Sequence, residues 1–152
     1  SNFPIEELRR LLGESEIKPS LIQVECHPYF PQTELKALLK EHNIALQAWY
    51  PLGGRGNASI MSEPVIEEIA KTHGKSPAQV ILRWHVQLGH SIVPGSKTPS
   101  HIAENLDLFD FELTNEEMAQ INGLDKGEPI FQRTPEVEHF FATFAPDVDS
   151  EK

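Results

Sequence analysis

The sequence predicts an α/β fold built around a parallel sheet. Segments with apolar side chains at helical spacing alternate along the chain with short apolar runs rich in β-forming residues. Prolines or capping residues stand at the start of most of the helical segments. Because strands that alternate with helices pair in parallel through right-handed crossovers, the pattern favours a parallel sheet over a hairpin-based one.

The first three elements alternate between helix and strand. Residues 4–13, PIEELRRLLG, carry leucines at helical spacing, with Pro4 suited to the first turn and Gly13 suited to a C-terminal cap. Residues 21–26, LIQVEC, are short, apolar and rich in β-forming residues, which predicts a buried strand. Residues 32–43, QTELKALLKEHN, place three leucines on one face of a second helix.

The middle of the chain adds a strand, a loop and two helices. Residues 44–52, IALQAWYPL, predict a second strand that Pro51 ends. Residues 53–62, GGRGNASIMS, predict a flexible loop because glycine is frequent there. Two helices are expected next, over residues 63–73 and 76–89.

The remaining elements follow the same logic. Residues 90–96 predict a third strand, and residues 98–106 predict a helix with Thr98 as its N-cap. A last helix is expected over residues 113–124.

Capping boxes mark two of these helix starts. Ser76 with Gln79, and Thr114 with Glu117, have the spacing in which each partner bonds the other's backbone N–H.

The domain division follows from composition. Residues 1–125 are expected to form one domain, and residues 126–152 an acidic, proline-punctuated and irregular tail. Four phenylalanines predict that this tail packs against another surface: Phe131, Phe140, Phe141 and Phe144.

Charge and cysteine content limit the partners and the compartment. The 152 residues include 23 acidic and 13 basic side chains, a formal charge of -10 that disfavours nucleic acid and anionic membranes. One cysteine cannot form an internal disulfide, and no apolar run reaches the roughly 18 residues that span a bilayer. A cytoplasmic protein is expected.

Chain length conflicts with a complete parallel-sheet architecture. Only three strands are predicted, and such a sheet would have two open edges. A closed (β/α)8 barrel takes about 250 residues, so this chain is expected to supply only part of one.

The most reactive-looking stretch is Glu25, Cys26 and His27, at the end of a predicted strand. Neighbouring strand residues point to opposite faces, so the three converge on a substrate only if the strand ends there. Pro28 indicates that it does end. A strand exit that shapes the following loop is the preferred interpretation, and a cysteine–histidine hydrolase is the alternative.

The histidines do not predict a metal site. None of the seven forms an H-x-x-x-H pair, and the lone cysteine cannot build a structural zinc site. No dedicated metal site is expected.

Two loops are candidates for ligand binding. The sequence PLGGRG lacks the spacing of known phosphate loops, yet it follows a parallel strand, where ligands bind in this architecture. In VPGSKTPSHIAENL, Ser96, Lys97 and His101 would face an anion near a helix N-terminus, or the segment is an ordinary, well-capped connection. Trp49, at a strand end, would either stack on a flat ring or pack in the core.

Together these segments resemble the C-terminal half of an aldo-keto reductase, close to the bacterial 2,5-diketo-D-gluconate reductase-like branch. The resemblance extends from Ser1 to about Asp125 and rests on ordered motifs: SNF, QVECHP, AWYPLG, GKSPAQVILRWHVQLG, IVPGSK and HIAENLDLFDFELTNEEMAQINGL. It implies part of a (β/α)8 barrel, or TIM barrel, that reduces aldehydes and ketones with NADPH.

The resemblance also implies a set of coenzyme-binding residues. Ser1, Asn2 and Gln23 would hydrogen-bond the nicotinamide carboxamide, and Trp49 would stack on the nicotinamide ring. Along the pyrophosphate would lie Tyr50, Leu52 and Gly53. Around the adenosine 2′-phosphate and the adenine would lie Ser96, Lys97, His101, Glu104 and Asn105.

The chain departs from the family pattern in two respects. Gly95-Ser96 stands where the family often has Lys-Ser, and His101 where it often has Arg, which binds phosphate better than imidazole does. NADH is therefore not excluded. The catalytic Asp, Tyr, Lys and His of the family all belong to its N-terminal half, so no catalytic residue is expected in this chain.

The resulting hypothesis is a cofactor-binding half of a carbonyl reductase that is inactive alone and pairs with an N-terminal half. The substrate would be a small carbonyl compound, and the aromatic tail would form part of its rim. The alternative from another class is a non-catalytic nucleotide-binding module, or a half-barrel that self-associates through its open edges.

Overall fold

A computed structural model of the chain describes residues 1–54 and 58–145. Its strands are β1 (Leu21–Glu25), β2 (Ala45–Trp49) and β3 (Ser91–Ile92). They form one parallel sheet in the order β1-β2-β3, in which Gln23 pairs with Gln47 and Gln47 with Ser91. The three predicted parallel strands are confirmed, although each is shorter than its apolar run.

The helices are α1 (Ile5–Glu14), α2 (Thr33–Glu41), the 3-10 helix η1 (Ala58–Ser62), α3 (Pro64–His73), α4 (Pro77–Gln87), α5 (Pro99–Leu106), α6 (Asn115–Asn122) and α7 (Pro135–Thr143). Helices α1 to α6 occur in the predicted order, whereas η1 and α7 were not predicted. No helix of the described ranges is both long and apolar enough to cross a membrane.

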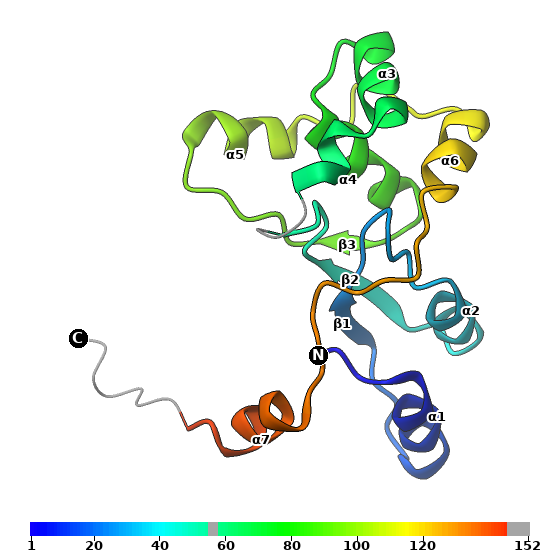
Figure 1. The fold of residues 1–152 in the computed structure, drawn as a ribbon. Coiled ribbons are helices and arrows are strands. Elements are labelled where there is room, and N and C mark those ends of the chain that lie inside the picture. Colours follow the sequence, from blue (N-terminus) through cyan, green and yellow to red (C-terminus); the bar gives the residue numbers. More distant parts are fainter. Residues whose placement is uncertain (55–57, 146–152) are drawn as a thin grey trace.

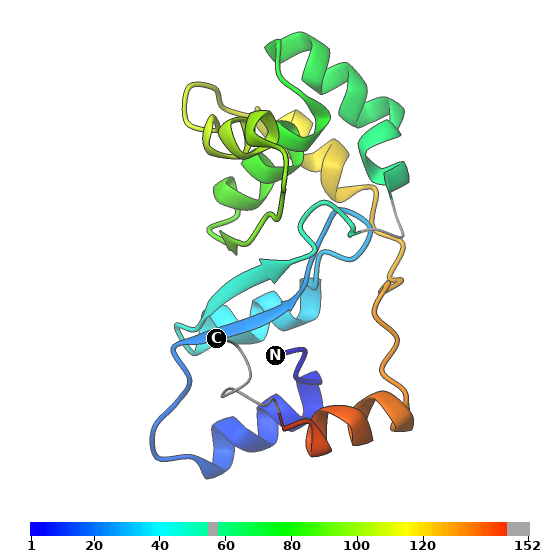
Figure 2. The ribbon, with the colours of Figure 1, turned by 90° about the vertical axis from the view of Figure 1, so that its left-hand side faces the viewer.

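The helices are distributed unevenly around the sheet (Figures 1 and 2). Helices α3 to α6 gather beyond β3, α1 lies at the opposite end, and α2 flanks the sheet. An extended segment after α6 runs past the sheet and ends in α7. Within the described residues, β1 and β3 each pair only with β2, so neither outer edge of the sheet has a partner strand, although the Asn2 N–H donates to the Gln23 carbonyl at 2.8 Å.

Two hydrophobic clusters hold the elements together. The first joins α1 and α2 to the sheet and contains Leu8, Leu12, Ile22, Val24, Cys26, Leu35, Leu38, Leu39, Ile44, Leu46 and Ala48. The second joins the helices beyond β3 and contains Tyr29, Ile60, Ile66, Ile69, Ala70, Val80, Ile81, Trp84, Leu113 and Ile121. The sheet therefore connects two packing units.

Both predicted capping boxes are confirmed. The Ser76 hydroxyl accepts from the Gln79 N–H at 3.3 Å, and the Gln79 side chain accepts from the Ser76 N–H at 3.0 Å. Thr114 and Glu117 make the equivalent pair at the start of α6. These contacts involve residues three apart, which is why the sequence pattern alone identified them.

Two local predictions were wrong. Gly13 lies inside α1, which continues to Glu14 and is capped by Ser15. The loop predicted over residues 53–62 contains a 3-10 helix over Ala58–Ser62, while its residues 55–57 lie outside the described part.

The tail also differs from its prediction. It was expected to be irregular but contains α7, which Thr134 caps by accepting from the Val137 N–H. Of its phenylalanines, Phe131 is half-buried, whereas Phe140, Phe141 and Phe144 are 55%, 62% and 58% exposed. Residues 146–152 lie outside the described ranges.

Glu117 also connects α6 to α3, because its carboxylate lies 2.9 Å from His73 Nε2. Burial raises the pKa of Glu117, but hydrogen bonds from the Thr114 N–H and the His73 ring outweigh it and hold the pKa below 4.5. A carboxyl group with a lowered folded-state pKa stabilises the fold above its unfolded pKa, and this contribution is lost as the pH falls through the folded value.

The substitution Glu117→Gln isolates this contribution. Glutamine at position 117 keeps the capping box and removes only the charge of the bond to His73. The variant is therefore expected to lose about 1–2 kcal/mol of unfolding free energy near pH 5. Urea denaturation should show this difference shrinking as the pH falls to about 3. An equal difference at both pH values would contradict the assignment.

Candidate functional site

A hollow lies where β2 and β3 end. It has a volume of about 780 Å³ and is lined by Trp49, Tyr50, Pro51, Leu52, Gly54, Met61, Val93, Pro94, Gly95, Ser96 and Lys97. Five of the residues expected to bind a coenzyme therefore share one pocket: Trp49, Tyr50, Leu52, Ser96 and Lys97. The carboxyl ends of parallel strands are where this architecture binds ligands.

A tight turn forms one wall of the pocket. Tyr50 has φ +52°, and the Gly53 N–H donates to the Tyr50 carbonyl at 2.8 Å. Gly54 has φ +61°, and a Cβ added there would lie 2.8 Å from the Tyr50 ring. Gly53 itself is buried and does not line the pocket. The turn needs glycine for both its backbone conformation and its close contact with an aromatic ring.

Alanine at position 54 is expected to distort this wall. The left-handed backbone and the ring contact should together cost roughly 2 kcal/mol of unfolding free energy. The matched control is Gly13→Ala, since Gly13 is helical with no atom within 4 Å of the added Cβ, and it should stabilise by about 0.5–1 kcal/mol. Thermal melts of both variants test this, and equal melting temperatures would contradict the assignment.

Trp49 is held by three neighbours. Its Nε1 donates to Asn2 Oδ1 at 2.7 Å, the Tyr50 ring centroid is 4.2 Å away, and the Phe131 ring approaches edge-on at 5.7 Å. The indole is half-buried, with part of its surface lining the pocket. Trp49 therefore packs against these neighbours and also lines the pocket, while its stacking on a flat ring stays a prediction.

Asn2 and Gln23 lie at β1, outside the lining of the 780 Å³ pocket. Asn2 Oδ1 also accepts from the Glu25 N–H at 3.0 Å, so its oxygen is engaged within the protein. Gln23 Nε2 donates to Gln47 Oε1 at 2.7 Å, and Gln47 Nε2 donates to Ser91 Oγ at 3.0 Å. This ladder of side chains crosses all three strands at paired positions. Ser1 is exposed at the chain start.

The expected anion-binding end begins at β3. Ser96 Oγ accepts from the Thr98 N–H at 3.1 Å, while Thr98 makes no side-chain cap of its own. Lys97 is exposed and lines the pocket. The remaining expected residues lie on α5 outside the lining: His101, Glu104 and Asn105. They are three and four positions apart, so they share one face of the helix.

Glu25 and His27 form a structural connection at the exit of β1. Glu25 is 2% exposed and accepts from His27 Nε2 at 2.9 Å and from the N–H groups of Ile130 and Phe131 at 2.6 and 2.8 Å. Burial raises the pKa of Glu25, but these hydrogen bonds outweigh it and keep the pKa below 4.5. The carboxylate thus fixes the extended segment that follows α6.

Cys26 does not have the properties of a catalytic nucleophile. It is fully buried, and burial raises the pKa of its thiol to about 12. A nucleophilic cysteine needs a lowered pKa and an accessible thiolate. The strand-exit interpretation is supported over the cysteine–histidine hydrolase.

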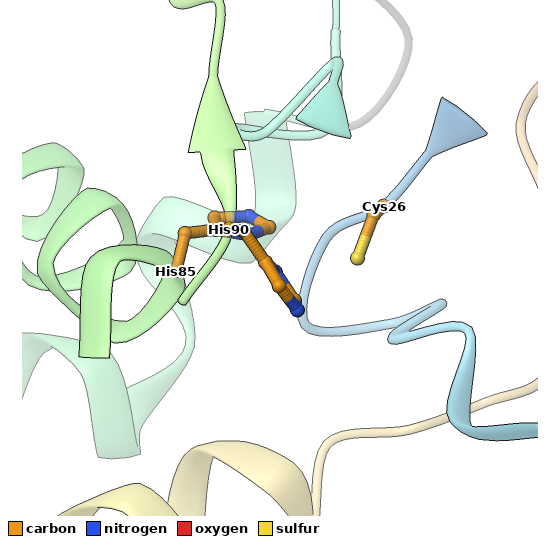
Figure 3. Close-up of side chains that lie close together, drawn as sticks. All are labelled: Cys26, His85 and His90. Atoms are coloured by element: carbon orange, nitrogen blue, oxygen red, sulfur yellow. The ribbon is translucent and has the colours of Figure 1, made fainter. Parts of the chain in front are cut away.

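A cluster that local spacing missed surrounds Cys26. His85 and His90 place ligand atoms within 4.8 Å of its sulfur and of each other (Figure 3). Burial lowers the pKa of His85 well below 6.5 and that of His90 to about 4, so both rings are neutral at physiological pH. Only the folded chain brings together these residues, which are up to 64 positions apart in the sequence.

Comparison with known proteins gives the family. The model of the Aldo/keto reductase family matches residues 1–126. The 2,5-diketo-D-gluconic acid reductase B of a Corynebacterium species is 42% identical over 127 residues, which are 84% of this chain and 45% of that protein.

Solved structures agree. MGS-M4, an aldo-keto reductase enzyme from a deep-sea metagenome library, has a TM-score of 0.83 at 34% identity, over 86% of this chain and 48% of its own. A substituted form of Gox0644 in complex with NADPH has a TM-score of 0.75 at 40% identity, over 82% of this chain and 45% of its own.

The chain thus spans a little under half the length of the proteins it matches, from 45% to 48%. Its sheet and helices correspond to part of a (β/α)8 barrel, as the sequence predicted. The resemblance found in the motifs is confirmed, and the chain belongs to the aldo/keto reductase family of oxidoreductases.

Proposed function

We propose that this chain provides the coenzyme-binding part of an NADPH-dependent reductase that converts small aldehydes or ketones to alcohols in the cytoplasm. The 780 Å³ pocket, whose lining includes Trp49, Tyr50 and Lys97, is the observation that carries this proposal. Its volume is within the range of roughly 300–1,000 Å³ found for small-molecule sites. An aromatic face beside a cation suits a flat ring joined to phosphates.

NADPH would supply the hydride that reduces the carbonyl carbon. Trp49, held by Asn2 and Tyr50, would present its exposed face to the nicotinamide and so fix which side of that ring faces the substrate. The turn from Tyr50 to Gly54 would follow the pyrophosphate, while Ser96 and Lys97 would receive the adenosine 2′-phosphate. Gln23 would orient the carboxamide from the side-chain ladder.

The tail would form part of the substrate rim. Glu25 fixes the backbone of Ile130 and Phe131, and this holds the Phe131 ring against Trp49. An apolar edge beside the expected hydride position would exclude water from the reacting carbonyl.

Titration calorimetry with NADPH and NADH tests the coenzyme assignment. The chain is expected to bind NADPH more tightly than NADH. The substitution Lys97→Ala should weaken the affinity for NADPH roughly tenfold and change the affinity for NADH by no more than about twofold, because only NADPH carries the 2′-phosphate. The control Lys40→Ala removes an exposed cation at the end of α2, away from the pocket. Equal losses for both coenzymes in Lys97→Ala would contradict the assignment.

Reduction of a carbonyl group also requires a proton donor, and under this proposal the chain does not provide one. The proton donor of the family, a tyrosine, and its Asp, Lys and His partners would come from an N-terminal half-barrel. The 152-residue chain alone should therefore show no NADPH oxidation with a panel of aldehydes. Measurable turnover, lost in a Tyr50→Phe or Tyr29→Phe variant, would contradict this part of the proposal.

A second candidate is a half-barrel that self-associates without catalysis. The observation favouring it is that β1 and β3 each pair on one side only in the described residues, which leaves two open edges. Light scattering distinguishes the two: a defined dimer that binds coenzyme without turnover favours self-association, whereas a monomer that forms a complex with an N-terminal half favours the reductase.

A further inference from the structure

Three side chains able to ligate a metal meet between the sheet and α4. Cys26 follows β1, His85 lies in α4, and His90 directly precedes β3. Their exposed fractions are 0%, 0% and 9%. Figure 3 shows the thiol and the two imidazoles lying close together, carried by three separate segments of the chain. They lie outside the lining of the coenzyme pocket.

The hydrogen bonds of His85 fix its tautomer. Its Nε2 lies 3.3 Å from the Pro51 carbonyl oxygen, which can only accept, so Nε2 carries the hydrogen. The lone pair is therefore on Nδ1, which lies 3.1 Å from His90 Nδ1 and accepts the hydrogen of that ring. An imidazole that donates one N–H to a backbone carbonyl and directs its other nitrogen inward is oriented as metal-ligating histidines are.

We propose that Cys26, His85 and His90 bind a thiophilic d¹⁰ cation, Cu⁺ or Zn²⁺. A thiolate and two imidazoles are the ligands that such ions prefer. Two nitrogens bound tetrahedrally at about 2.05 Å from one ion lie about 3.3 Å apart, close to the 3.1 Å between the two Nδ1 atoms. The sulfur lies within 4.8 Å of one ring nitrogen of each histidine and has to approach by a small movement of one side chain.

The proton balance of binding is simple. The sulfur–metal bond replaces the S–H bond of Cys26, and that proton leaves to solvent. The His90 hydrogen moves from Nδ1 to Nε2, with no net gain or loss. One proton is therefore released for each ion bound, and the ion keeps its oxidation state.

The neighbouring charge favours the monovalent ion. Lys36 lies beside the cluster, with its ammonium 6.0 Å from the Trp84 ring, and it interacts electrostatically with Cys26, His85 and His90. A thiolate with Cu⁺ is neutral, whereas a thiolate with Zn²⁺ keeps one positive charge close to Lys36. Cu⁺ is therefore expected to bind more tightly, and Lys36→Met should strengthen Zn²⁺ binding several-fold while changing Cu⁺ binding little.

Binding would also connect the cluster to the coenzyme pocket. His85 contacts the carbonyl of Pro51, which belongs to the turn that lines that pocket. An ion that fixes the His85 ring would fix this turn in place.

The test uses Co²⁺ as a spectroscopic probe on the folded chain. Because the chain has one cysteine, a sulfur-to-cobalt charge-transfer band can arise only from Cys26. The band should saturate at one equivalent and disappear on adding Zn²⁺, and competition with a chromogenic Cu⁺ chelator then ranks the two d¹⁰ ions. Cys26→Ser should abolish the band and His90→Gln should weaken binding at least tenfold, while the exposed His42→Gln should match the parent chain.

No band with the parent chain, or a band unchanged in both His85→Gln and His90→Gln, would overturn the proposal. Circular dichroism checks that the variants fold. The parent chain also provides a measurement that needs no substitution. Because Cys26 is buried, its alkylation requires opening of the fold, and Zn²⁺ or Cu⁺ should slow this alkylation at least tenfold until a chelator restores the original rate. Alkylation at an unchanged rate would contradict metal binding at this thiol.

Discussion

Replacing Glu25 with alanine is expected to lower the free energy of unfolding by roughly 3–5 kcal/mol. The carboxylate is almost fully buried and is the acceptor for His27 Nε2 and for the N–H groups of Ile130 and Phe131. Alanine leaves these donors without a partner, and a buried unsatisfied donor costs more than a normal hydrogen bond contributes. Urea denaturation followed by circular dichroism measures the loss.

The same substitution should release the segment before α7. Limited proteolysis is expected to cut near residues 128–133 faster in Glu25→Ala than in the parent chain. Glu25→Gln retains one carbonyl acceptor and should show a smaller effect. The control is Glu16→Ala, since Glu16 is exposed and should change stability by no more than about 0.5 kcal/mol. A loss under 1 kcal/mol in Glu25→Ala would contradict the role assigned to this carboxylate.

Replacing Trp84 with alanine should cost about 3–5 kcal/mol. The indole is fully buried in the helical cluster, and its Nε1 donates to Asn122 Oδ1 at 3.0 Å, which connects α4 to α6. Alanine removes this hydrogen bond and leaves a large cavity. Trp84→Phe keeps most of the volume and should cost only about 1–2 kcal/mol. Equal destabilisation by the two substitutions would show that the hydrogen bond, rather than packing, dominates.

Local signals predicted most of the fold. Ser76 and Thr114 were identified as helix starts because their contacts reach only three residues along the chain. The start of α7 carries the same kind of signal, Thr134 followed by Pro135, but the surrounding acidic and proline-rich composition obscured it. Gly13 was assigned as a cap although the helix runs through it, because a glycine near a helix end fits both roles.

The site could be predicted only in part, because some of its contacts join residues that are far apart in the sequence. Trp49, Tyr50 and Lys97 were expected from motifs at strand ends, and the structure places them around one pocket. The contact between Asn2 and Trp49 spans 47 positions, and the cluster of Cys26 with His85 and His90 depends on three elements meeting. No local sequence spacing predicts such contacts, because they form only when elements distant in the sequence pack together.

The most direct test of the central claim is titration of the chain with NADPH, followed by tryptophan fluorescence. If Trp49 lines the coenzyme pocket, NADPH should quench the emission to saturation, and Trp49→Phe should remove this quenching while the emission of buried Trp84 remains. Quenching that persists unchanged in Trp49→Phe, or no saturable quenching in the parent chain, would contradict the claim that these residues alone form a coenzyme site.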